Sequence, residues 1–115
     1  MYDRSMLLRS LALAALGFGC GSGGNQLPRD RVTSAGEALF NGYTKPDVKC
    51  FECHDGTGHG STWGPSLVQR VPRRTDDELA ATIRGGKGKM PAFRDKLTDP
   101  EIAQLVTWLR STFGH

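Results

Sequence analysis

Residues Cys50 to Gly56 read CFECHDG, and they place two thiols and an imidazole within five consecutive positions. If these residues form one turn of helix, the side chains of Cys50 and Cys53 lie on the same face, because residues three apart are neighbours there. His54 follows directly and can reach a group that is bound at that face. The spacing therefore predicts a site that uses both sulfur atoms and the imidazole together.

The pattern C-x-x-C-H, here Cys50, Cys53 and His54, is typical of covalent attachment of c-type haem. Two thiols on one face can bond the two vinyl-derived carbons along one edge of a porphyrin, and the adjacent histidine then becomes the proximal iron ligand. A redox-active dithiol is the first alternative, but such motifs follow a strand, and no strand pattern precedes Cys50. A Cys2His2 zinc site that includes His59 is the second, although its ligands would crowd into ten residues. Haem is the favoured interpretation.

The size of the chain limits it to one small domain. It has 115 residues, of which 37% are hydrophobic and 23% are charged. A domain of this size buries only a modest core and is usually stabilised further by disulfides, a metal or a bound cofactor. A covalently attached haem would supply that stabilisation.

Three helix starts are predicted where Ser or Thr is followed three residues later by Glu: Ser34–Glu37, Thr75–Glu78 and Thr98–Glu101. The third helix has apolar side chains at the spacing of one helical face, namely Ile102, Leu105, Val106 and Leu109. The second is expected to end at Gly85-Gly86, where glycine can adopt a left-handed conformation. No stretch alternates as a strand, so we predict an all-α domain with three main helices. The loops over residues 54–74 and 85–97 have the length of segments that wrap a ligand.

The N-terminal residues 1–19 are expected to form an export signal. Arg4 and Arg9 precede a short apolar run from Leu11 to Phe18, which ends in small residues before Cys20. A membrane-spanning helix needs roughly 20 apolar residues, so this run is too short for one. We therefore expect the mature protein to lie outside the cytoplasm.

Cys20 is expected to carry a lipid. The sequence LGFGC followed by GSGGNQ resembles the processing site of a bacterial lipoprotein, although Gly17 stands where such signals usually have leucine. The alternative is cleavage nearby by another peptidase, with Cys20 lost or left as an idle thiol. Residues 20–32 are polar and glycine-rich, and we expect them to form a flexible tether ahead of a domain over residues 33–115.

Further residues carry a family resemblance. Together with the C-x-x-C-H motif, the segment GPSL at residues 64–67 resembles class I cytochrome c, and the resemblance extends over residues 33–113. It implies the cytochrome c fold, in which helices and long loops wrap around one covalent haem. It also implies that the Pro65 carbonyl accepts a hydrogen bond from the second nitrogen of His54 and so orients the ring.

The same resemblance assigns the packing of the first and last helices and the sixth iron ligand. It implies that Gly36 and Phe40 pack against Trp108. The segment GGKGKMPAF at residues 85–93 resembles the family's loop that carries the distal methionine, which makes Met90 the expected ligand. Met1 and Met6 would leave with the predicted signal, so Met90 is expected to be the only methionine of the mature chain. The alternative role for such a methionine is core packing, but its glycine, proline and lysine neighbours do not resemble a core sequence.

Two histidines are weaker candidates for the sixth position, since His59 would have to cross the ring plane and His115 ends the chain. A thioether ligand favours ferrous iron and closes the site to small substrates, which indicates electron transfer and not enzyme catalysis. The chain has a formal net charge of +3, and loss of Arg4, Arg9 and Asp3 with the signal lowers it by one. Basic residues gather around the methionine loop, where they form either a docking patch for redox partners or an ordinary solvated loop: Arg84, Lys87, Lys89, Arg94 and Lys96.

The sequence therefore predicts a monomeric, membrane-tethered monohaem cytochrome c on the periplasmic side of a bacterial membrane, where it relays single electrons between protein partners. Nucleic-acid binding is not expected, because no basic helix or matching motif is present. The alternative is a haem domain with a labile Met90 bond, acting as an enzyme, a gas sensor or a subunit of a larger oxidoreductase.

Overall fold

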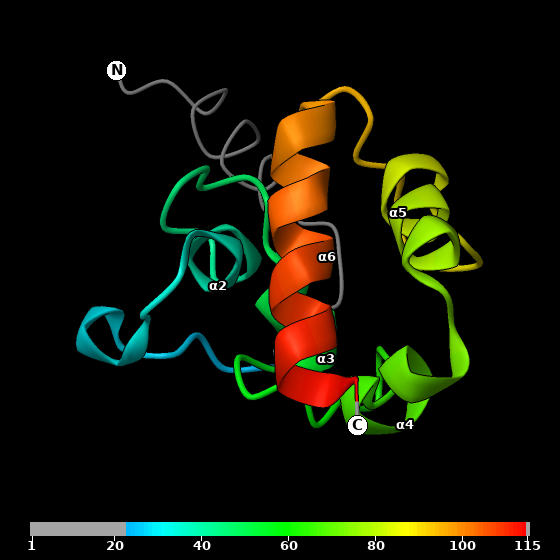
Figure 1. The fold of residues 1–115 in the computed structure, drawn as a ribbon. Helices are drawn as coiled ribbons and strands as arrows, with labels where there is room; N and C mark the ends of the chain where they lie inside the picture. Colours follow the sequence, from blue (N-terminus) through cyan, green and yellow to red (C-terminus); the bar gives the residue numbers. More distant parts are fainter. Residues whose placement is uncertain (1–22, 115) are drawn as a thin grey trace, which may run out of the picture.

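The computed structural model describes residues 23–114, and within them the regular structure is helical. The elements are η1 (Arg29–Arg31), α2 (Ala35–Phe40), α3 (Cys50–His54), α4 (Leu67–Arg70), η2 (Val71–Arg73), α5 (Asp76–Gly85) and α6 (Asp99–Phe113). Figure 1 shows α6 in the middle, with α2 on one side and α5 on the other. Extended pairing within these residues is limited to an isolated bridge between Lys87 and Met90. The predicted all-α fold is confirmed.

The helix starts lie where the sequence predicts them. Thr75 and Thr98 each cap the backbone N–H of the glutamate three residues on, and each glutamate side chain accepts the backbone N–H of its threonine. At the first helix the glutamate side chain bonds to the residue before the cap and not to the cap itself. The Ser34 hydroxyl accepts the Glu37 N–H at 3.1 Å, while the Glu37 carboxylate accepts the N–H of Thr33 at 3.0 Å.

Gly86 ends α5 in a conformation that requires glycine. Its φ of 76° and ψ of 171° lie outside the left-handed helical cap that was expected, in a region essentially restricted to glycine. A Cβ there would lie 2.6 Å from the carbonyl oxygen of Met90. The chain can therefore turn directly from α5 into the loop that carries Met90.

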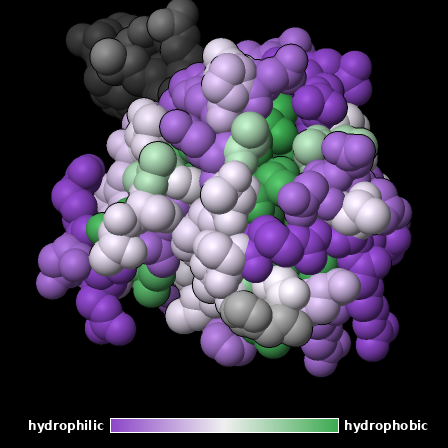
Figure 2. Space-filling model, in the orientation of Figure 1, coloured by the Kyte–Doolittle hydropathy of each residue, from purple (hydrophilic) through white to green (hydrophobic). Residues whose placement is uncertain are grey.

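The core is built where α2 crosses α6. A Cβ on Gly36 would lie 2.5 Å from both the Gln104 carbonyl oxygen and the Trp108 Cβ, so the two helices touch through the glycine. The rings of Phe40 and Trp108 pack with their centroids 5.0 Å apart, as the family resemblance implied. The face shown in Figure 2 is mostly hydrophilic, with small apolar areas between charged side chains. The buried apolar side chains join α2 and α5 to α6: Leu39, Phe40, Val48, Leu67, Val71, Ile83, Phe93, Leu97, Ile102, Leu105, Val106, Trp108 and Leu109.

The expected flexible tether over residues 20–32 is wrong for its C-terminal part. Asn25 donates its backbone N–H to Asp55 and accepts that of Gly56, and Leu27 donates to the side-chain oxygen of Asn41 at 2.9 Å. Asn41 is fully buried, so it can hold Leu27 only because the segment packs onto the domain. The folded domain therefore begins near residue 25.

The predicted signal over residues 1–19, the expected lipid site at Cys20 and the terminal His115 lie outside the described residues. Between residues 23 and 114, no helix has the length and apolar character needed to cross a membrane.

Candidate haem site

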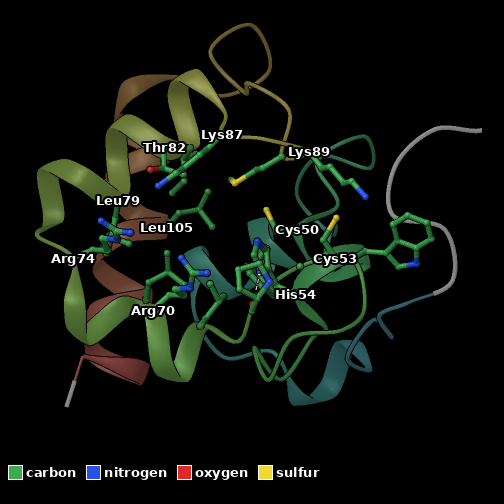
Figure 3. Close-up of a pocket in the computed structure, with 18 residues that line it drawn as sticks. Cys50, Cys53, His54, Arg70, Arg74, Leu79, Thr82, Lys87, Lys89 and Leu105 are labelled. Atoms are coloured by element: carbon green, nitrogen blue, oxygen red, sulfur yellow. Dashed lines mark hydrogen bonds between the residues drawn. The ribbon is translucent and has the colours of Figure 1, made fainter.

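The short helix α3 presents Cys50, Cys53 and His54 to one cavity (Figure 3). The helix stops because Asp55 takes a φ of 63°, which is unusual for a residue other than glycine. The Asp55 carboxylate holds this turn by accepting the Thr57 hydroxyl at 2.6 Å and the Asn25 N–H at 3.0 Å. The bond from Thr57 is the main cause that lowers the pKa of Asp55. The turn sends the chain away directly after the histidine.

The ring of His54 is fixed by a carbonyl. Its Nδ1 lies 2.9 Å from the carbonyl oxygen of Pro65, which is the contact that the family resemblance implied. Because a carbonyl can only accept, Nδ1 carries the proton, and the neutral ring keeps its free lone pair on Nε2. Burial lowers the pKa of His54, and the bond to Pro65 opposes that shift. The histidine is therefore prepared to act as a nitrogen ligand.

The loop behind α3 is held close enough for Pro65 to reach the ring. A Cβ on Gly64 would lie 2.8 Å from the Cys53 carbonyl oxygen, so a larger residue could not pack there. The same carbonyl accepts the Ser61 hydroxyl at 2.6 Å, and the N–H of Gly60 bonds to the carbonyl of His54 at 2.8 Å. These contacts explain why a glycine precedes Pro65 in the sequence.

Met90 lines the same cavity as His54. Two backbone hydrogen bonds of 2.9 and 3.0 Å join Met90 to Lys87 and close the tip of the loop, where Gly88 has a φ of 58°. Figure 3 shows Lys87 and Lys89, which precede Met90 in sequence, on the far side of the cavity from His54. The two residues expected to bind iron therefore come from separate segments that face one space.

The alternatives for the thiols and for the sixth ligand receive no support. Burial raises the pKa of the Cys50 thiol to about 12, whereas a reactive dithiol needs a thiolate. Residues 23–114 contain no group of three or more His, Cys, Asp or Glu side chains arranged to hold a metal ion. His59 is exposed and bonds to the Thr57 hydroxyl at 2.8 Å, and it does not line the cavity.

The cavity has a volume of about 320 Å³ and combines an apolar wall with a cationic rim. Its apolar wall comes from α2, α4, α5, α6 and the loop before α4: Phe40, Trp63, Pro65, Leu67, Leu79, Ile83, Leu105 and Leu109. Four of its lining side chains are cationic, namely Arg70, Arg74, Lys87 and Lys89, and none of the described lining residues is acidic.

Comparison with known proteins agrees with this geometry. The family model described as cytochrome c oxidase, cbb3-type, subunit III, matches residues 31–109. The chain belongs to this family of c-type cytochromes. Its cofactor is one covalently bound haem c, and its class of activity is electron transfer.

The individual proteins similar to this chain are also named as cytochromes c. This chain is 28% identical over 112 residues to cytochrome c-555 of Methylococcus capsulatus, and the match covers 96% of this chain and 87% of that one. It is 27% identical over 75 residues to cytochrome c6 of Parathermosynechococcus lividus, covering 62% and 86%. The crystal structure of the c-type cytochrome XoxG from Methylobacterium extorquens AM1 aligns with a TM-score of 0.52 and 31% identity, over 66% of this chain. The match covers 51% of the XoxG chain, so this cytochrome spans about half the length of that protein.

The residues of the cavity fit a haem. Two cysteine sulfur atoms one helical turn apart suit covalent attachment of a c-type haem, an oriented imidazole and a thioether suit its iron, and the apolar wall suits a porphyrin ring. A ring with two carboxylate groups also needs cations at its margin, and the rim supplies them. Three residues that line the cavity, Arg70, Arg74 and Trp63, belong to no motif that the sequence pattern marked. The four-residue spacing of Arg70 and Arg74 after the GPSL segment is the one signal that could have drawn attention to them.

Proposed function

We propose that the protein is a single-electron carrier in which Cys50 and Cys53 bond the haem and His54 and Met90 bind the iron. The observation that carries this proposal is the convergence of all four side chains on one apolar cavity. A haem iron held by these residues would supply the redox chemistry, the uptake and release of one electron.

The chain's own residues prepare the iron for that task. The Pro65 carbonyl holds His54 in one orientation and increases its donor strength. Met90 would supply a thioether, which would favour ferrous iron and block the binding of a small substrate. His54 ends helix α3 and is held by Pro65, and Met90 sits on a loop closed by its backbone bonds to Lys87, so little of the structure would have to rearrange when the charge on the iron changes.

The partners are proposed to be redox proteins with an acidic surface near their own cofactor. Lys87 and Lys89 are exposed at the rim of the cavity and are the centre of the proposed docking patch. Arg84 contributes less than its place in the sequence suggests, because its guanidinium pairs with Asp99 at 3.2 Å. Complementary charge of this kind mainly speeds encounter and aligns the two cofactors.

The finer aspects of location rest on the sequence. We propose that the protein is exported, works on the periplasmic side of a bacterial membrane as a monomer, and is tethered by a lipid on Cys20. Because the domain begins near residue 25, the tether between the lipid and the folded domain is only a few residues long. The haem would then remain close to the membrane surface.

Covalent haem is the property to test first. We expect the protein, expressed with a cytochrome c maturation system, to retain haem-linked peroxidase staining on a denaturing gel. Replacing both Cys50 and Cys53 with alanine should abolish the stain, whereas Cys20→Ser, which also removes a sulfur atom, should keep it. A wild-type protein that contains zinc and no pigment would overturn the proposal.

A role as a subunit is the second candidate, because the matching family model is named for an oxidase subunit. Native purification from the source membrane distinguishes the two. A carrier should elute alone and exchange electrons with added acceptors. A subunit should co-elute in fixed proportion with other chains.

A further inference from the structure

The N-terminal segment joins the domain beside an exposed aromatic ring at the cysteine edge of the cavity. An added Cβ on Gly23 would lie 2.5 Å from Cδ1 of Trp63, so these two residues are packed together. Trp63 lines the cavity and lies next to Lys89. We propose that Trp63 and Lys89 dock on the surface of the membrane that holds the lipid of Cys20. This inference rests on the proposed lipid anchor and on the proposed attachment of haem at α3.

The place where the segment enters the domain is fixed by backbone contacts. An added Cβ on Gly24 would overlap the Phe51 carbonyl oxygen, so only glycine fits against α3 there. The Asn25 N–H donates to the Asp55 carboxylate at 3.0 Å, and the Asn25 carbonyl accepts the Gly56 N–H at 2.8 Å. The segment therefore cannot swing away from the helix that carries the cysteines without breaking these contacts.

The length of chain before Gly23 limits where a lipid on Cys20 could lie. Gly23 follows Cys20 by three residues, and three residues span at most about 11 Å when fully extended. The backbone of the lipid-bearing residue would therefore remain within that distance of Gly23, and so close to the Trp63 ring. Acyl chains inserted in the bilayer would hold this corner of the domain at the membrane surface.

Trp63 is exposed in a way that suits such a surface. Among residues 23–114, the large apolar side chains that remain exposed are those of Trp63 and Val68, at 46% and 43%. A tight turn presents Trp63, because the Ser61 N–H bonds to the Gly64 carbonyl at 2.9 Å and the Ser61 hydroxyl accepts the Trp63 N–H at 3.0 Å. An indole combines an apolar body with a polar N–H, so tryptophan is favoured at the boundary between lipid and water.

Lys89 adds a positive charge to the same corner. Its ammonium lies 5.6 Å from the centre of the Trp63 ring, and Figure 3 shows Lys89 on the side of the cavity where the cysteines lie. The Asp55 carboxylate, which the entering segment contacts, is engaged by the Thr57 hydroxyl at 2.6 Å and by the Asn25 N–H. An aromatic ring and an ammonium together match a membrane surface with anionic phospholipid headgroups.

A domain docked in this way would hold its haem in one orientation to the membrane. The edge bonded to Cys50 and Cys53 would face the lipid surface. Lys89 would meet headgroups, which leaves Lys87 as the lysine of the proposed docking patch that a protein partner can reach. That partner would have to approach along the membrane, so we expect it to be a redox protein embedded in the same bilayer.

Hydroxyl-radical footprinting of the native lipidated holoprotein in phosphatidylglycerol vesicles tests the docking surface. Trp63 should be oxidised several-fold more slowly than in neutral phosphatidylcholine vesicles, whereas Val68, which has a similar exposure, should be oxidised equally in both. Lys89→Gln should lower the ratio of docked to undocked protein about fivefold, which corresponds to the contribution of about 1 kcal/mol from one basic residue near an anionic surface. Lys96→Gln is the matched control, because Lys96 is exposed and does not line the cavity.

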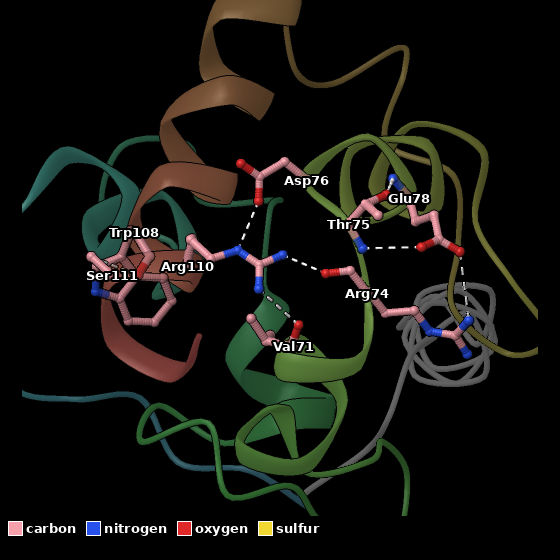
Figure 4. Close-up of polar contacts among 8 residues, drawn as sticks. All are labelled: Val71, Arg74, Thr75, Asp76, Glu78, Trp108, Arg110 and Ser111. Atoms are coloured by element: carbon pink, nitrogen blue, oxygen red, sulfur yellow. Dashed lines mark hydrogen bonds and ion pairs between the residues drawn. The ribbon is translucent and has the colours of Figure 1, made fainter. Parts of the chain in front are cut away.

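Linear dichroism of the haem absorption in oriented bilayers provides the second measurement. The wild-type holoprotein should show a dichroic Soret band, and Trp63→Gln should reduce the dichroism because the domain would no longer hold one orientation. Arg110→Gln controls for lost stability alone and should leave the dichroism unchanged. Figure 4 shows the Arg110 guanidinium of α6 reaching the Asp76 carboxylate, at 2.8 Å, and the Val71 carbonyl, at 3.1 Å. Arg110 does not line the cavity.

Three results would overturn the inference and leave the electron-carrier proposal standing. The first is a lipidated holoprotein whose Trp63 is oxidised equally in both kinds of vesicle. The second is a native protein whose N-terminal peptide carries no lipid by mass spectrometry. The third is a Lys89→Gln variant that exchanges electrons more slowly with an added redox protein while the Trp63 footprint stays as in the wild type, since the corner then belongs to a protein partner. A wild type without covalent haem would instead remove the proposed function itself.

Discussion

Replacing Gly36 with alanine should destabilise the protein, even though alanine is the better helix former. Gly36 is buried in α2, and an added Cβ would lie 2.5 Å from the Gln104 carbonyl oxygen and 2.5 Å from the Trp108 Cβ. Both neighbours belong to α6 and neither is the flexible end of a side chain. Ordinary contact begins near 3.4 Å, so α2 and α6 must part by about 1 Å.

Two effects of opposite sign set the size of the loss. Overpacking a tight contact costs about 1–3 kcal/mol, and weakening the Phe40–Trp108 ring contact adds about 1 kcal/mol. The helix propensity of alanine returns about 1 kcal/mol relative to glycine. We therefore expect a net loss of about 1–3 kcal/mol, which corresponds to a fall in Tm of roughly 4–24 °C for a domain of this size.

Guanidinium unfolding of the holoprotein, followed by circular dichroism, measures this difference. Gly85→Ala is the control, because Gly85 also lies in a helix and an added Cβ there meets only the end of the Arg94 side chain, at 3.6 Å. That variant should be as stable as the wild type or slightly more stable. Because Phe40 lies 6.4 Å from the His54 ring, Gly36→Ala should also alter the optical spectrum of the haem. A Gly36→Ala protein as stable as Gly85→Ala would refute the reasoning.

Three further changes test the ligand, the anchor and an ion pair. Met90→Ala should abolish the near-infrared sulfur-to-iron band, let carbon monoxide bind the ferrous protein and lower the potential, whereas a wild type that already binds carbon monoxide tightly would contradict ligation by Met90. Cys20→Ser should release the protein from the membrane fraction or block its processing, and unchanged fractionation would remove the lipid anchor from the proposal. The Lys45 ammonium, 2.7 Å from Glu101, is the main cause that lowers the pKa of that carboxyl from 4.5 to about 2. A carboxyl with a lowered pKa stabilises the folded state above pH 4.5, and this stabilisation is lost as the pH falls toward 2. Lys45→Met should therefore lower the free energy of unfolding by its full amount at neutral pH and by almost nothing in acid. An equal loss at both pH values would contradict this assignment.

The parts of the structure that the sequence predicts are those decided by neighbouring residues. The cap of each helix depends on residues three apart, and the motif at α3 depends on five consecutive residues. The packing of residues 25–31 onto the domain could not be predicted from neighbouring residues. It depends on the buried Asn41, whose side chain accepts the N–H of Leu27 from 14 residues away in the sequence. Helix α4 and η2 also lie inside a stretch that the pattern marked as loop. Their form follows from the burial of Leu67 and Val71 against α6, which only the folded chain brings about.

The same distinction bears on how the domain would transfer electrons. The two expected iron ligands are fixed by backbone contacts of different origin, since Pro65 holds His54 and the loop of Met90 is closed at its base by the bond from Phe93 N–H to the Ile83 carbonyl. Ile83 and Phe93 are both buried in the core that α6 organises. Loss of either ligand therefore does not require loss of the other, and the site could open at Met90 while the haem stays attached to α3. The stability of the Met90 loop, and not that of the whole fold, should then decide whether the protein remains a carrier or binds external ligands.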